Sequence, residues 1–161
     1  MIPSTKTIDG YSFIKYKSKK VDTTALVTRS KSYFEKIDTR RSVRDFSNKS
    51  IPLSVIKNLI RSASTAPSGA HKQPWTFCVV KNKVMKTTIR IAAEKEERES
   101  YENRMSEEWL DAIKPLQTNW EKSFLETAPY LIVVFKKSYD LLANGTKRNN
   151  YYVSESVGLA C

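Results

Sequence analysis

The sequence predicts an α+β fold in which helices flank a central sheet. Two apolar runs of strand length lie at residues 75–80 and 130–135, and the segments around them carry apolar residues at helical spacing. The chain has 161 residues, enough for one domain with its own core. Its hydrophobic share of 40% and charged share of 28% are ordinary for a soluble globular chain, so a disordered or membrane-embedded protein is not expected.

The helical patterns follow an N-terminal arm. Residues 1–25 have weak periodicity and are interpreted as an extended arm that wraps a surface or a partner, ahead of a domain at 26–161. Within that domain, residues 26–37 fit a helix. Pro52 suits the first turn of the next helix, because that position needs no amide hydrogen. Its apolar stripe consists of Val55, Ile56, Leu59, Ile60 and Ala63.

Two strands and two more helical patterns follow. Residues 75–80 are rich in β-branched and aromatic side chains, and residues 130–135 predict a strand covered on both faces. Residues 84–104 predict a long charged helix. A second stripe contains Pro115, which we expect to kink or divide the helix; its apolar members are Trp109, Ile113, Leu116, Trp120 and Phe124.

The C-terminal segment stops inside an apolar helical pattern. Val153, Val157 and Ala160 share one side of this helix, and no polar cap precedes the last residue, Cys161. We therefore expect the fold to be incomplete at the C-terminus. Apolar partners would then be missing for residues 133–135 and 153–160.

Several classes of chemistry are disfavoured by residue types. Cys78 and Cys161 lack metal-ligand or disulfide-framework spacing, and His71 is the only histidine, so no metal site is expected. Difficult chemistry would need an organic cofactor. The first residues show no signal peptide, which predicts a cytoplasmic protein unless an N-terminal membrane anchor has been removed.

The net charge of +11 is compatible with binding to nucleic acid, anionic lipid or a phosphorylated cofactor. The basic residues are spread along the chain without a recognisable nucleic-acid motif, so nucleic acid is not expected as a partner. Arg40, Arg41 and Arg44 lie in a short connection, where guanidinium groups could clamp a phosphate and Ser42 could add a hydroxyl. Ordinary surface charge is the alternative.

Two further groups of residues could bind ligands. Ser68, Gly69 and Ala70 could bring backbone amides close to a flat or anionic ligand, or could simply end a helix in a turn. Glu97 and Tyr101 share a helix face, and Lys122 lies on the later helical pattern. Together these three could hold the ammonium and carboxylate of an amino acid, although a charged helix facing water is the simpler interpretation.

The order of these motifs resembles the iodotyrosine deiodinases of the FMN-dependent nitroreductase superfamily. The resemblance rests on 40–44 (RRSVR), 65–71 (TAPSGAH) and 74–77 (PWTF). It continues through Glu97, Tyr101, Lys122 and Tyr151-Tyr152, covering residue 28 to the end. It implies an α/β sandwich with a mainly antiparallel central sheet. An active-site lid would lie at about 95–122, and the fold would continue past Cys161 with further flavin contacts.

The resemblance also implies roles for individual residues. Arg40, Arg41, Ser42, Val43, Arg44, Ser68 and Gly69 would bind FMN. The Ala70 amide would receive the substrate phenolate, while Glu97, Tyr101 and Lys122 would hold the amino acid end of a halotyrosine. No side chain would act as a catalytic group, because the flavin carries the redox step.

The implied activity is reductive dehalogenation of mono- and diiodotyrosine to tyrosine and iodide. Electrons would come from an external reductase or NAD(P)H, and the implied assembly is a homodimer with shared flavin sites. A nitroaromatic or quinone reductase of the same superfamily and an inactive fragment are the alternatives. Only an amino acid substrate would need Glu97, Tyr101 and Lys122.

Overall fold

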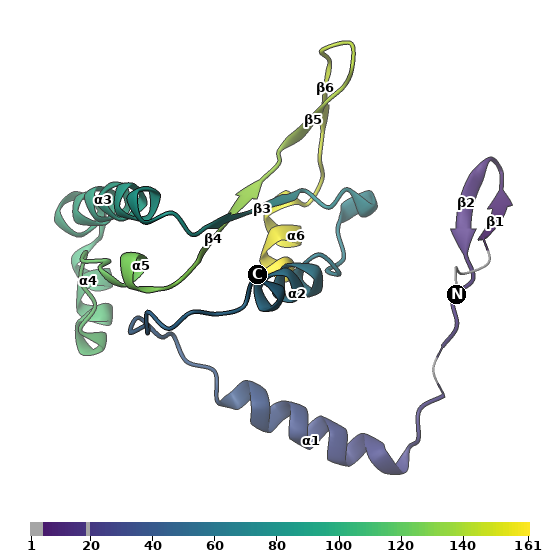
Figure 1. Ribbon diagram of the computed structural model, residues 1–161, viewed down its shortest axis with the longest axis horizontal. Helices are drawn as coiled ribbons and strands as arrows, with labels where there is room; N and C mark the ends of the chain where they lie inside the picture. The colour runs from purple at the N-terminus through teal and green to yellow at the C-terminus, as the bar shows by residue number, and fades with distance from the viewer. Residues whose placement is uncertain (1–4, 19) are drawn as a thin grey trace. The chain divides into compact units, whose positions relative to one another are not determined.

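The computed structural model describes residues 5–18 and 20–161 (Figure 1). It separates into two units, residues 1–42 and residues 43–161, which are described in turn. Among the described residues, no helix is long and apolar enough to cross a membrane.

The first unit begins with a β-hairpin. Strand β1 (Thr5–Ile8) pairs antiparallel with β2 (Tyr11–Ile14). Asp9 and Gly10 connect them with φ of 51° and 81°. Positive φ at both turn residues matches the right-handed twist of a hairpin. Part of the predicted extended arm is therefore a hairpin, while residues 1–4 and 19 of that arm lie outside the described residues.

Helix α1 (Thr24–Asp38) confirms the helix predicted for 26–37. At its start, the Asp22 carboxylate accepts hydrogen bonds from the Thr24 hydroxyl and amide, and these lower the pKa of Asp22. Within the described chain, no residue of α1 is buried. Its apolar residues are exposed: Leu26, Val27, Tyr33, Phe34 and Ile37.

In the second unit, helix α2 (Leu53–Ala63) carries the predicted apolar stripe, but only one side of it is covered. Ile56 is buried and Ile60 half-buried, whereas Val55 and Leu59 are exposed. The short turn η1 (Gly69–His71) then leads into β3 (Trp75–Val80), the strand predicted at these residues.

Strand β3 pairs antiparallel with β4 (Leu131–Lys136), from Trp75 opposite Lys136 to Val80 opposite Leu131. The predicted burial of β4 on both faces is wrong. Ile132 and Phe135 are 38% and 55% exposed, because neighbouring elements cover the strand incompletely. Together with the flanking helices, this antiparallel pair confirms the predicted α+β class.

Helix α3 (Lys83–Glu99) is capped by Asn82, whose side chain accepts a hydrogen bond from the Met85 amide. It continues into a π-helical turn, η2 (Ser100–Arg104), and the two confirm the predicted long charged helix. On its covered side, Lys86 is buried and donates to the carbonyls of Glu126 and Ala128. Arg90 forms an ion pair with Glu126 that lowers the pKa of the Glu126 carboxyl.

The next helical pattern divides, as Pro115 predicts. It becomes α4 (Glu107–Ile113), the turn η3 (Lys114–Leu116) and α5 (Phe124–Thr127). Gln117 has φ of 50°, which no right-handed helix accommodates. The sequence interpretation that placed Trp120 and Lys122 on a helix is therefore wrong, because 117–123 is an irregular segment.

The chain ends with a second hairpin and a helix. Strands β5 (Tyr139–Leu141) and β6 (Lys147–Asn149) pair antiparallel around a turn in which Gly145 has φ of 80°. Helix α6 (Val153–Ala160) contacts strand β4, and its residues Val157 and Ala160 are buried. The expectation that 153–160 lacks apolar partners is wrong for these two residues, but Phe135 is largely exposed as expected.

Candidate functional site

The turn between α2 and β3 has a strained backbone and one unused donor. Ala70, His71 and Gln73 have φ of 49°, 54° and 46°, conformations that cost non-glycine residues of order 1–3 kcal/mol each. The His71 amide donates to the Ser68 carbonyl, and the Gln73 amide donates to the Ser68 hydroxyl. Among the described residues, nothing accepts a hydrogen bond from the Ala70 amide, and Ala70 is exposed. The turn therefore leaves the Ala70 N–H group exposed to solvent.

Gly69 is needed because another part of the chain approaches it closely. A Cβ at this position would lie 2.9 Å from the Tyr151 carbonyl oxygen and 3.0 Å from the Tyr152 ring. The structure places the backbone that leads into α6 on the side of Gly69 where a Cβ would project. The expected contact between Gly69 and FMN stays a prediction.

An ion-pair cluster ties the same turn to the β5–β6 hairpin. Asp140 lies 3.7 Å from Lys72, 2.9 Å from Lys137 and 3.6 Å from Arg148. Its pKa is lowered, first by the hydrogen bond from Lys137 and then by the charges of Lys137 and Lys72. This cluster was not foreseen, because neither hairpin strand was recognised in the sequence.

Two of the predicted head-group residues, Glu97 and Lys122, lie together. The Lys122 ammonium is 3.5 Å from the Glu97 carboxylate and 2.7 Å from the Asn119 carbonyl. The Tyr101 hydroxyl, in η2, lies 3.0 Å from the Thr118 hydroxyl. The irregular segment 117–123 thus contacts α3 through Lys122 and η2 through Thr118.

The arginine-rich segment divides between the two units. Arg40, Arg41 and Ser42 end the first unit, and the Arg41 guanidinium donates to the carbonyls of Asp38 and Arg40 beside the end of α1. Val43 and Arg44 open the second unit. All five are exposed, and among the described residues the side chains of Arg40 and Arg44 make no ion pair.

The turn with Ala70 and the Glu97–Lys122 pair are separated within the second unit. Turn η1 precedes β3 and helix α3 follows it, so the two groups belong to opposite ends of this strand (Figure 1). A strand of 6 residues spans roughly 20 Å. One chain therefore does not bring Ala70 to the head-group residues.

Comparison with known proteins identifies the family. The model of the nitroreductase family matches residues 37–161. An iodotyrosine deiodinase from Haliscomenobacter hydrossis is 57% identical over 150 residues, which cover 93% of this chain and 68% of that protein. The chain belongs to the nitroreductase family. The resemblance to iodotyrosine deiodinases seen in the sequence is confirmed.

Two further matches are also iodotyrosine deiodinases. The iodotyrosine deiodinase of Hydra vulgaris is 45% identical over 99% of this chain and 58% of its own length. A crystal structure of oxidized iodotyrosine deiodinase bound to FMN and 3-iodo-L-tyrosine matches with a TM-score of 0.67 and 31% identity, over 79% of this chain and 63% of that one. The chain thus spans about two thirds or less of these relatives.

Proposed function

We propose that this chain is part of an FMN-dependent iodotyrosine deiodinase acting on mono- and diiodotyrosine. The observation that carries the proposal is the Glu97–Lys122 pair, in a chain whose relatives are named iodotyrosine deiodinases. Tyr101 follows Glu97 by four residues and contacts Thr118 of the segment that carries Lys122. A carboxylate and an ammonium 3.5 Å apart are complementary to the ammonium and carboxylate of an amino acid.

The residues present fit an FMN-binding role. The exposed Ala70 amide and the exposed guanidinium groups of Arg40 and Arg44 offer donors of the kind that bind anionic oxygens. In the proposal, Arg40–Arg44, Ser68 and Gly69 hold the cofactor, and the Ala70 amide holds the substrate phenolate. When bound and reduced, FMN supplies the two electrons with which a proton replaces iodide on the ring carbon.

We also propose a homodimer in which each flavin site uses both chains. Ala70 and the Glu97–Lys122 pair lie at opposite ends of β3, so a single chain leaves each group with half of a site. The exposed apolar residues of the hairpin and α1 would gain cover in such a dimer. An external reductase or NAD(P)H would supply the electrons.

The test is a titration of the purified chain with FMN, followed by 3-iodotyrosine, diiodotyrosine and a nitroaromatic compound. Retained flavin, quenching by the iodotyrosines, and release of iodide and tyrosine after reduction would support the proposal. Nitroaromatic reduction without deiodination would favour the reductase alternative. A chain that retains no FMN would contradict the proposal for these residues alone. Sedimentation of the same sample measures the dimer.

A further inference from the structure

The segment that carries Lys122 is attached to α3 by two contacts outside the proposed head-group residues. The Lys122 amide donates to the Glu94 carboxylate at 2.9 Å. The other Glu94 oxygen accepts from Arg90 at 2.6 Å, which fixes the direction of the carboxylate. Four residues along the helix, the Arg98 guanidinium lies 3.9 Å from the centre of the Trp120 ring.

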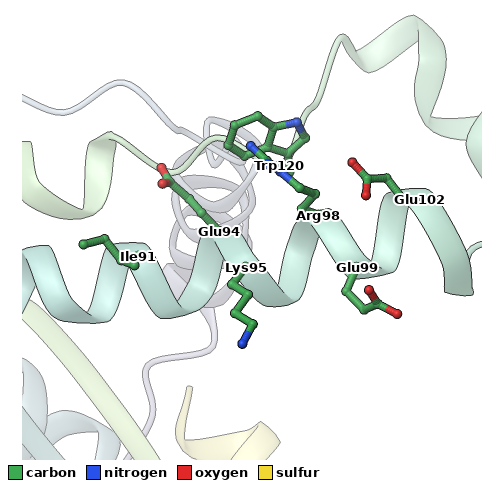
Figure 2. A pocket seen from close by; sticks show the side chains of 7 residues that line it. All are labelled: Ile91, Glu94, Lys95, Arg98, Glu99, Glu102 and Trp120. Atoms are coloured by element: carbon green, nitrogen blue, oxygen red, sulfur yellow. The ribbon is translucent and has the colours of Figure 1, made fainter.

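Glu94, Arg98 and Trp120 also line a hollow of about 340 Å³ beside α3. Figure 2 shows Glu94, Arg98 and Glu102 on the side of the helix that faces Trp120, with Lys95 and Glu99 pointing away from it. Glu94 is well covered, with 16% of its side chain exposed, so its hydrogen bond to Lys122 is shielded from water.

The two contacts determine where the Lys122 side chain begins. The segment lacks helical hydrogen bonds of its own between Gln117 and Ser123, so its position depends on what it touches. Glu94 holds the Lys122 backbone, Arg98 holds Trp120, and the Lys122 ammonium then lies beside Glu97. If these contacts with α3 were removed, the segment could move, and the Lys122 ammonium would no longer be held 3.5 Å from the Glu97 carboxylate.

We propose that Glu94 and Arg98 are positioning residues that hold the 117–123 segment on α3 and so set the spacing of Lys122 and Glu97 for an amino acid head group. This rests on the proposed function. Neither residue touches the substrate in the proposal. Both act through the segment, and their loss should affect ligands with an amino acid head group and spare those without one.

The experiment compares 3-iodotyrosine with 2-iodophenol, which lacks the head group, by calorimetric titration of the full chain with FMN present. Glu94→Ala should weaken 3-iodotyrosine binding about tenfold and leave 2-iodophenol unchanged, as expected for one lost hydrogen bond to a charged group. Glu94→Gln keeps a carbonyl acceptor and should restore most of the affinity. Arg98→Ala should weaken 3-iodotyrosine binding severalfold. Arg98→Lys should weaken it less, because lysine keeps a cation over the Trp120 ring.

Glu102→Ala is the matched control. Glu102 lines the same hollow but, among the described residues, its side chain makes no hydrogen bond or ion pair, so both ligands should bind as before. Unchanged 3-iodotyrosine binding in Glu94→Ala, or an equal loss for both ligands, would overturn the positioning role. A wild-type chain that does not prefer 3-iodotyrosine to 2-iodophenol would overturn the proposed function instead.

Amide hydrogen exchange gives a readout that needs no ligand. Glu94→Ala should speed exchange of the Lys122 amide about tenfold, while Glu102→Ala leaves it unchanged. Unaltered exchange in Glu94→Ala would contradict the attachment of the segment. If Glu94→Ala does not fold, Arg98→Ala, whose side chain is exposed, provides the comparison, again measured at the Lys122 amide.

Discussion

The side-chain nitrogen of Lys122 lies 3.5 Å from a carboxylate oxygen of Glu97, so the two charges compensate each other in the free chain. An amino acid head group that enters between them exchanges one ion pair for two. This exchange favours a zwitterion over a ligand with a single charge, which would leave either Glu97 or Lys122 without its partner.

Glu97→Gln and Lys122→Met should each weaken 3-iodotyrosine binding by about tenfold or more, because each removes one charge-assisted contact. Binding of 2-iodophenol should stay within about twofold of wild type. Glu96→Gln is the control, since Glu96 pairs with Arg104 at 3.0 Å on an exposed part of the same helix. Titration calorimetry measures all three, and equal losses for both ligands would contradict head-group recognition.

Gly69→Ala should lower the free energy of unfolding by about 1–3 kcal/mol, because the new methyl group would lie 2.9 Å from the Tyr151 carbonyl oxygen. FMN affinity should fall with it if this turn binds the cofactor. Gly158→Ala is the matched control, because a methyl group added there would meet no atom within 4 Å apart from its chain neighbours and the nearby backbone of its own helix. Because Gly158 lies in α6, that change should be neutral or stabilise by about 0.5–1 kcal/mol. Urea denaturation compares the two, and an equal effect would show that the Tyr151 contact is unimportant.

The elements that could be predicted from sequence are those that local chemistry defines. The bounds of β3 follow from a run of β-branched and aromatic residues between Pro74 and Asn82. Division at Pro115 follows from its missing amide hydrogen. The two hairpins were missed although Asp9-Gly10 and Asn144-Gly145 are typical hairpin turns, because their flanking strands are only 3 or 4 residues long.

The sequence identified candidate site residues more readily than it predicted their positions in the fold. Helical spacing continues from Trp109 to Trp120, and nothing in the sequence indicates that Gln117 adopts positive φ. The contacts of Lys122 with Glu94 and Glu97 join distant parts of the chain and depend on that break. Residue chemistry suggested what these side chains could bind, whereas their proximity is a tertiary property that local patterns do not contain.

Acid should weaken the attachment of α5 to α3 through Glu126. The hydrogen bond from Arg90 is the main cause of the lowered pKa of Glu126. A carboxyl whose pKa is lower in the folded chain contributes stability above its ordinary pKa of about 4.3, and this is lost as pH falls through the lower folded value. Glu126→Gln should therefore reduce the loss of stability between about pH 5 and pH 3, measured by thermal unfolding.

The partner residue supplies the check on this pH dependence. Arg90→Met removes the same interaction from the other side, so it should reduce the acid sensitivity in the same direction. The double variant should change it no further than Glu126→Gln alone, because both substitutions act on one ion pair. Additive effects would mean that another group causes the shift.

Lys86→Met should lower the free energy of unfolding by about 2–3 kcal/mol, because it leaves the carbonyls of Glu126 and Ala128 without their donor. Lys86 is 5% exposed and makes these bonds at 2.7 Å and 2.6 Å, so water cannot readily replace it. Lys83→Met, on the exposed side of the same helix, should change stability by less than about 0.5 kcal/mol. The measurement is urea denaturation of both variants beside wild type. If Lys86→Met were as stable as Lys83→Met, methionine packing would compensate for the lost hydrogen bonds, and Lys86 would not be needed to hold α5 on α3.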